Sequence, residues 1–187
     1  MDNKKLRKWT ITGIFAIFIL ASLWHFVYDW IPNGVTATIF PVYESPWEHV
    51  KLFFFPAIIF YLIQYFVVGK NYKNFIFSHG LMLVFMPALT LGLFYFYRNA
   101  LMIEESLIID IIINFFCIAL GSFIAYKMTI AKIKLQRWNY VTLIVVLLLF
   151  AVNSVLTFYP PHKPIFYDKN IEAYGLDEGT GDLDHDH

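Results

Sequence analysis

The sequence has few charged residues and almost no cysteine, and both shortages limit the classes of protein to which the chain can belong. Only 15% of its 187 residues are Asp, Glu, Lys or Arg, whereas soluble domains carry about 25%. The formal net charge is +0, which favours neither nucleic acid nor an acidic ligand as a partner. The single cysteine, Cys117, cannot form an intramolecular disulfide, so cysteine usage indicates no redox compartment.

Catalytic signatures are also lacking. The chain has no G-x-S-x-G nucleophile motif, no H-E-x-x-H zinc motif and no glycine-rich phosphate loop. Cys117 lies in an apolar stretch with no neighbouring base, which is typical of a small core residue rather than a nucleophile. The motifs therefore leave open whether the protein is an enzyme.

Apolar residues are what the chain has in excess. They make up 59% of it, and the mean hydropathy is +0.59. Five runs reach the length of about 20 residues that a helix needs to cross a bilayer, and such long continuous runs do not fit barrel strands. We therefore predict an all-α, polytopic membrane protein whose residues 1–158 form a five-transmembrane-helix bundle in the lipid bilayer. The predicted spans are residues 9–30, 47–68, 75–97, 107–126 and 139–158.

Basic residues indicate the orientation of these spans. Four are counted outside the lipid on one side: Lys51, Arg98, Lys163 and Lys169. Ten lie on the other side: Lys4, Lys5, Arg7, Lys8, Lys70, Lys73, Lys127, Lys132, Lys134 and Arg137. The positive-inside rule places the larger group in the cytoplasm. We expect a multi-pass plasma membrane protein with its N-terminus inside and its C-terminus outside.

The last segment, residues 159–187, differs from the rest of the chain. It begins with a proline-containing stretch and ends in Gly and Asp residues without an apolar period. It holds seven of the 14 acidic residues. We predict an extracytoplasmic segment whose acidic tail is disordered.

Most of the titratable residues near the spans fall at their outer ends. The candidate pocket or ligand-binding residues are His25, Asp29, Glu44, Glu48, His49, His162 and Asp168. Ser22, His25 and Asp29 have the i, i+3, i+7 spacing of one helical face. The segment that follows Pro160-Pro161 is stiff and can fold back over this outer mouth as a lid, or simply leave the membrane.

The sequence around Glu48 allows two interpretations of its role. Ser45-Pro46-Trp47-Glu48 matches a capping box with proline at the first helical position, which by itself explains the glutamate. Glu44 and His49 are not explained in this way. Two carboxylates beside an imidazole can bind a divalent cation, with His25, Glu48 and His49 as candidate metal ligands. The same groups can form a carboxylate pair for proton transfer, with Glu44 or Glu48 as general base.

The outer segments resemble a known family. The motifs are His25-Phe26-Val27-Tyr28-Asp29-Trp30, the run from Pro41 through His49, Phe54-Phe55-Pro56, and Phe158-Tyr159-Pro160-Pro161-His162 through Asp168. They resemble a family of small, uncharacterised integral membrane proteins found mainly in Gram-positive bacteria, a domain of unknown function. The resemblance implies a bacterial plasma membrane and no established activity.

Three functional hypotheses follow. The first is a small binding or transport-type protein with a cation-binding pocket at the outer face. The second is a membrane-embedded, metal-dependent hydrolase that acts on a lipid-like substrate. The third is a structural or accessory subunit. Five spans are few for a stand-alone transporter, which favours a homo-oligomer or a partner within a membrane complex.

Overall fold

Five long helices dominate the molecule. The computed structural model describes residues 3–103 and 106–175. The long helices are α1 (Asn3–Trp24), α4 (Val50–Val67), α5 (Phe75–Tyr95), α6 (Leu107–Thr129) and α7 (Asn139–Phe158). Helix α5 continues into the π-helical turn η2 (Phe96–Ala100). All five are long and apolar enough to cross a membrane, which confirms the predicted number of apolar spanning helices.

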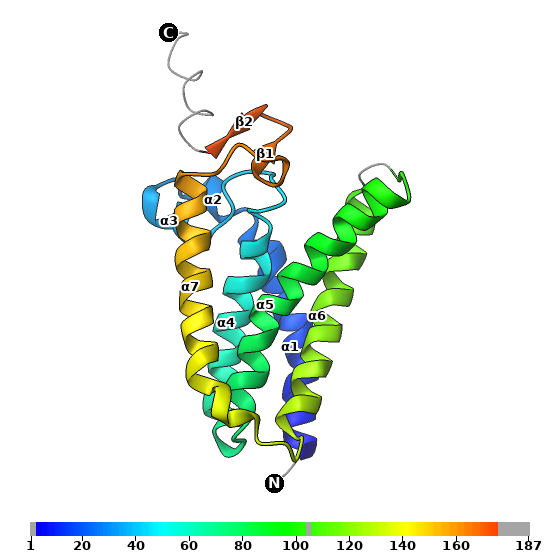
Figure 1. Ribbon diagram of the computed structural model, residues 1–187, viewed down its shortest axis with the longest axis vertical. Coiled ribbons are helices and arrows are strands. Elements are labelled where there is room, and N and C mark those ends of the chain that lie inside the picture. Colours follow the sequence, from blue (N-terminus) through cyan, green and yellow to red (C-terminus); the bar gives the residue numbers. More distant parts are fainter. Residues whose placement is uncertain (1–2, 104–105, 176–187) are drawn as a thin grey trace.

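Short elements cap the two ends of the bundle. Helices α2 (Val27–Trp30) and α3 (Gly34–Ile39), the turn η4 (Pro164–Phe166) and the antiparallel hairpin of β1 (Tyr167–Asp168) and β2 (Ala173–Tyr174) gather at one end. We call this the hairpin end. Helix α1 begins at the opposite end, beside the turns η1 (Gly69–Asn71) and η3 (Leu135–Trp138) (Figure 1). We call that the basic end.

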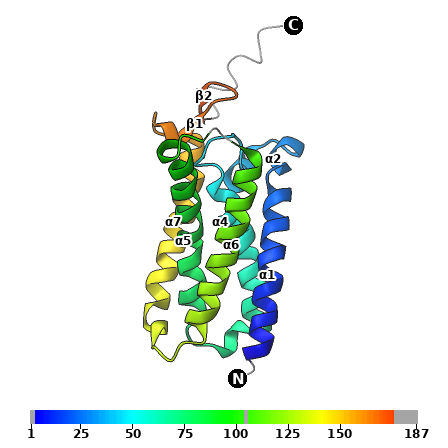
Figure 2. The same ribbon diagram turned by 90° about the vertical axis from the view of Figure 1, so that its right-hand side faces the viewer.

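Helix α4 is the most buried of the five long helices. It packs against α1 and α5, while α5 also packs against α6 and α7 (Figures 1 and 2). Within the apolar stretches, 61% of the α4 residues are buried but only 17% of those in α7. The outer helices therefore expose large apolar side chains such as Phe15, Ile112 and Leu147. Such surfaces are expected where helices face lipid rather than water.

The first span differs from its prediction. Helix α1 begins at Asn3 and ends at Trp24, and the chain turns before α2. The Trp24 indole N–H donates a hydrogen bond to the carbonyl of Ile39 at 3.1 Å, which ties this turn to α3. The predicted helical face of Ser22, His25 and Asp29 is therefore wrong, because the helix stops before His25. The turn leaves the His25 side chain free to face the loop that precedes α4.

One asparagine organises the basic end. The Asn74 amide donates hydrogen bonds to the carbonyls of Met128, Ala131 and Ile133, at 3.3, 3.1 and 2.9 Å. Its Oδ1 accepts hydrogen bonds from the N–H groups of Leu135 and Gln136. A buried amide satisfied in this way holds the α6–α7 connection against the start of α5. The predicted acidic tail, in contrast, lies mostly in residues 176–187, outside the described residues.

Candidate functional site

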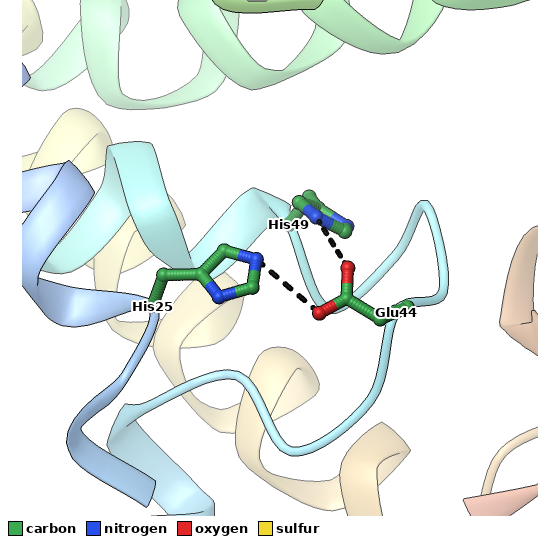
Figure 3. Close-up of side chains that lie close together, drawn as sticks. All are labelled: His25, Glu44 and His49. Carbon is green, nitrogen blue, oxygen red and sulfur yellow. Dashed lines mark ion pairs between the residues drawn. The ribbon is translucent and has the colours of Figure 1, made fainter. Parts of the chain in front are cut away.

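Two histidines meet one carboxylate at the hairpin end. His25 comes from the turn after α1, Glu44 from the loop after α3, and His49 from the residue before α4 (Figure 3). Glu44 Oε1 lies 3.4 Å from His25 Nε2, and Glu44 Oε2 lies 3.4 Å from His49 Nε2. The histidine side chains are 30% and 31% exposed and the Glu44 side chain 46%. The group is thus accessible to a small solute.

The protonation of His49 is constrained by the backbone. Its Nδ1 lies 2.8 Å from the Ser45 carbonyl oxygen. Because a carbonyl oxygen only accepts, Nδ1 must carry the proton and donate. In the neutral ring, Nε2 then directs a lone pair towards the anionic Glu44. Two acceptors can face each other stably only if a second proton or a cation lies between them.

The electrostatics of the group agree with this geometry. Hydrogen bonding from His25, and then from His49, holds the pKa of the Glu44 carboxyl well below its usual range. Burial acts to lower the pKa of His49, but hydrogen bonds to Glu44 and Ser45 and the charge of Glu44 outweigh it, so the pKa is raised. Glu44 is therefore anionic at neutral pH, and His49 favours binding a cation or a proton.

Glu48 belongs to a separate, fully buried ion pair. Its Oε2 lies 2.9 Å from Lys51 Nζ, and the two side chains are 2% and 0% exposed. Oε2 also accepts a hydrogen bond from the Val42 N–H, and Oε1 accepts one from the Thr157 hydroxyl at 2.8 Å. The Lys51 ammonium donates its other two hydrogen bonds to the carbonyls of Ala37 and Phe40. This pair joins α3, α4 and α7.

The predicted capping box is therefore only half formed. The Ser45 hydroxyl accepts a hydrogen bond from the Glu48 N–H at 3.3 Å. The Glu48 carboxylate turns inward to Lys51 instead of reaching back to Ser45. Helix α4 consequently begins at Val50, three residues after the predicted start of the span at Trp47.

The chain after α7 folds back over the loop that carries Glu44. We call residues 159–175 the strap. Asp168 is 3% exposed, and its Oδ2 accepts a hydrogen bond from the Glu44 N–H at 2.8 Å. The Trp47 N–H donates to the Ile165 carbonyl at 3.0 Å. The strap thus fixes the backbone of Glu44 without supplying a side chain to the His25–Glu44–His49 group.

The remaining candidate residues lie apart from this group. Asp29 is exposed on α2. The His162 ring stacks on Tyr174 within the strap, at 4.6 Å between ring centroids. In the described part of the chain, one set of three histidine, cysteine or acidic residues has ligand atoms close enough for one ion, and it is His25, Glu44 and His49. Of the predicted ligands His25, Glu48 and His49, the structure brings the two histidines together with Glu44. The Glu48 carboxylate pairs with Lys51 and Thr157 instead.

Sequence reasoning missed the partners of Glu48. The sequence predicts that Lys51 lies outside the lipid on the outer side, but its side chain is fully buried in α4. Its i, i+3 spacing from Glu48 was a usable signal for an ion pair on one helical face. Thr157 lies 109 residues from Glu48, and no local pattern links the two. Only the path of α7 brings them together.

The His25–Glu44–His49 group has the separations expected of metal ligands. Nitrogen and oxygen ligands lie about 2.0–2.2 Å from zinc, so two of them at a tetrahedral angle are about 3.3–3.6 Å apart. Each histidine lies 3.4 Å from a different oxygen of Glu44, and with one ligand atom from each residue the three atoms lie within 4.8 Å of one another. One ion would bind all three residues after the side chains move closer together.

Comparison with known proteins gives the chain a family but not an activity. Comparison with curated proteins finds no match, and neither does comparison with solved structures. One family model matches residues 1–176. That range includes the five long helices, the His25–Glu44–His49 group and the strap. The chain therefore belongs to the family of unknown function DUF6512.

Proposed function

We propose that this protein is a plasma membrane protein that binds a divalent transition-metal cation, such as Zn²⁺, at the outer face of the bilayer. The ligands are the Nε2 atoms of His25 and His49 and the carboxylate of Glu44. One observation carries the proposal. The His49 Nδ1–H donates to the Ser45 carbonyl, which leaves Nε2 as a lone-pair donor aimed at an anion. Metal-binding histidines commonly have this arrangement, with the other ring nitrogen donating to a carbonyl or carboxylate.

The distribution of basic residues supports an outward-facing site. The start of α1 carries Lys4, Lys5, Arg7 and Lys8, and six further basic residues lie at the basic end, in the last turn of α6 and in the connections that include η1 and η3. Of the four basic residues at the hairpin end, Lys51 is buried in its ion pair with Glu48. The positive-inside rule then puts the basic end in the cytoplasm and the hairpin end outside.

The ligand types favour zinc over calcium. Imidazole nitrogens suit Zn²⁺, Cu²⁺ and Ni²⁺, whereas Ca²⁺ and Mg²⁺ prefer sites built from oxygen ligands. Glu44 supplies one anionic ligand and the histidines supply two neutral ones. Together with the cation they leave a net positive charge on a half-exposed site that a water molecule or a substrate can reach.

Calorimetric titration of the purified full-length protein tests this proposal. We expect one Zn²⁺ per chain and no comparable binding of Ca²⁺. Removing a residue that supports a metal ligand lowers metal affinity by about 10–100-fold. Removing the ligand itself should cost at least as much, so we expect Glu44→Gln to weaken Zn²⁺ binding by that factor or more. Asp29→Asn is the matched control, because it removes one exposed carboxylate near the same end. Equal weakening by both substitutions, or equal binding by wild type and Glu44→Gln, contradicts the proposal.

The hydrolase hypothesis uses the same three ligands. Catalytic zinc sites have three protein ligands and keep a fourth position for water, and His25, Glu44 and His49 are three such ligands. Bound zinc would lower the pKa of that water and supply a hydroxide. Zinc-dependent release of product from an amphiphilic ester, abolished by Glu44→Gln and retained by Asp29→Asn, is the result this second candidate predicts. Stoichiometric zinc binding without such turnover favours the binding function.

A further inference from the structure

A polar pocket lies at the basic end, far from the histidines along the helices. Its volume is about 310 Å³. It forms where α4 ends and where α5 and α7 begin, and is lined by Tyr65, Lys70, Tyr72, Lys73, Gln136 and Asn139 around Ile76. We call it the basic pocket. Neither the proposed metal site nor any contact described above uses the ammonium groups of Lys70 and Lys73.

The lining of the basic pocket suits an anion. Both charged residues that line it are cations, and the remaining polar groups are two phenols and two amides. The Tyr72 hydroxyl already donates to Asn3, so the two ammonium groups are the main donors for a ligand. Across residues 3–103 and 106–175, the ion pairs found do not involve Lys70 or Lys73. Two exposed ammonium groups beside one concave surface, without a carboxylate between them, raise the local concentration of anions.

The walls of the basic pocket are held in place before any ligand arrives. The Asn74 Oδ1 accepts a hydrogen bond from the Gln136 N–H at 3.2 Å, which positions the η3 wall against α5. Asn139 Oδ1 accepts a hydrogen bond from the Phe77 N–H at 3.1 Å, which fixes the start of α7 against the same helix. The N-terminal ends of α5 and α7 therefore border the pocket together with the C-terminal end of α4, so two positive dipole ends face one negative end.

The surroundings of the basic pocket distinguish a lipid from a free anion. The last turn of α4 exposes Phe66 and Val67, which are 67% and 38% exposed. Ile133, in the connection to η3, is 68% exposed. The Phe66 ring packs against that of Tyr65, which lines the pocket, at 5.4 Å between centroids. A phosphodiester in the pocket would therefore have an apolar side chain near its acyl chains, whereas inorganic phosphate gains nothing from it. Basic pockets between membrane helices on the cytoplasmic side are known to accept anionic lipid headgroups.

We propose that the basic pocket binds the phosphate of an anionic phospholipid of the inner leaflet, held by Lys70 and Lys73. This site is independent of the metal site at the hairpin end. Lipid binding here fixes the depth of the basic end at the membrane surface. It also clamps the starts of α5 and α7 to each other through one headgroup.

Native mass spectrometry of the full-length protein in a neutral detergent tests the proposal. Phosphatidylglycerol and phosphatidylcholine with the same acyl chains are compared at equal concentrations. We expect selective retention of phosphatidylglycerol, reduced by about tenfold in the double variant Lys70→Gln/Lys73→Gln. Lys132→Gln/Lys134→Gln is the matched control, because it removes the same charge from exposed residues at the same end that do not line the pocket. We expect it to retain the lipid.

Three results overturn the proposal. Equal retention of the two lipids would show that the pocket does not select an anionic headgroup. An equal loss of phosphatidylglycerol binding in both double variants would mean that binding depends on net charge and not on the pocket. Displacement of phosphatidylglycerol by an equal concentration of inorganic phosphate assigns the pocket to a free anion instead of a lipid. All four substituted lysines are exposed, so the unfolding temperatures of the two variants should stay close to that of wild type, which thermal melting checks.

Discussion

At the scale of single residues, the two outer glutamates show how burial assigns different tasks to the same side chain. Glu48 is 2% exposed, and an ammonium group, a hydroxyl and a backbone N–H neutralise and satisfy it. Glu44 is 46% exposed and faces only imidazoles among the ion pairs of the described residues. A buried carboxylate with all these partners stabilises a fold, whereas a half-exposed one between two histidines remains available to a ligand.

The raised pKa of His49 makes metal binding depend on pH. Zn²⁺ binds the neutral imidazole, so a proton on Nε2 competes with the metal. Because the pKa of His49 lies above its ordinary value, this competition already operates near neutral pH. The pKa of Glu44 is depressed, so Glu44 remains anionic across the same range and does not limit binding.

We therefore expect the affinity for Zn²⁺ to rise as pH increases through the pKa of His49. Between about pH 8 and about pH 6 it should fall by about tenfold or more, with proton release on binding. Titrations in buffers of different ionisation enthalpy measure both quantities. An affinity that does not change over this range would mean that no imidazole binds the metal.

Lys51 offers a second test, of stability rather than binding. Lys51→Met leaves the Glu48 carboxylate buried without its cation, and removing one member of a buried pair costs about 3–5 kcal/mol. The double variant Glu48→Gln/Lys51→Met removes both charges and should recover a large part of that loss. Denaturant unfolding in micelles measures both changes. A single variant within about 1 kcal/mol of wild type would show that the pair is hydrated, because exposed pairs contribute about that much or less.

At the scale of elements, the strap and the loop before α4 form one unit. The Asp168 carboxylate accepts hydrogen bonds from the Glu44 N–H and the Asn170 N–H, at 2.8 and 2.7 Å. The Trp47 and Phe166 rings pack at 5.3 Å between centroids. Instead of closing over the site as a lid, the described strap supports the backbone that presents Glu44.

Asp168 should therefore influence metal affinity without touching the metal. Asp168→Ala removes the acceptor that holds Glu44, and loss of such a supporting contact lowers metal affinity by about 10–100-fold. Asn170→Ala is the control, since it keeps the backbone N–H that Asp168 binds. Zinc titration of the two folded variants checks the prediction. An unchanged affinity for Zn²⁺ in Asp168→Ala would show that the strap does not influence the metal site.

At the scale of the whole molecule, the features that lipid dictates were predictable and those that depend on long-range contacts were not. The apolar runs predict α4 through α7 closely, because a bilayer demands long apolar helices. The end of α1 at Trp24 depends on the bond from its indole to Ile39, 15 residues away. The strap depends on the bond from Glu44 to Asp168, across 124 residues. No local pattern contains either contact.

The candidate site was predictable in its location and not in its exact members. Titratable residues collect at helix ends because the hydrocarbon core rejects charge, so the sequence places Glu44, Glu48 and His49 near one surface. Which glutamate faces the histidines depends on Lys51 and Thr157 drawing Glu48 inward. The identity of the third ligand is therefore a property of the packed bundle.

The orientation of the whole molecule has a direct test. Lys169 at the hairpin end and Lys132 at the basic end are both exposed, and the native Cys117 is buried. In intact cells, a membrane-impermeant maleimide should label Lys169→Cys and spare Lys132→Cys, as the positive-inside rule requires. The opposite pattern would place the proposed metal site in the cytoplasm.

Zinc X-ray absorption spectroscopy of the purified protein, loaded with one Zn²⁺ per chain, identifies the metal ligands directly. We predict two imidazole nitrogens at about 2.0–2.1 Å and carboxylate or water oxygen at about 2.0–2.2 Å. His49→Gln should remove one imidazole contribution from this spectrum. A zinc shell composed only of oxygen, or a spectrum that His49→Gln leaves unchanged, would contradict the assignment of His25, Glu44 and His49 as the metal ligands.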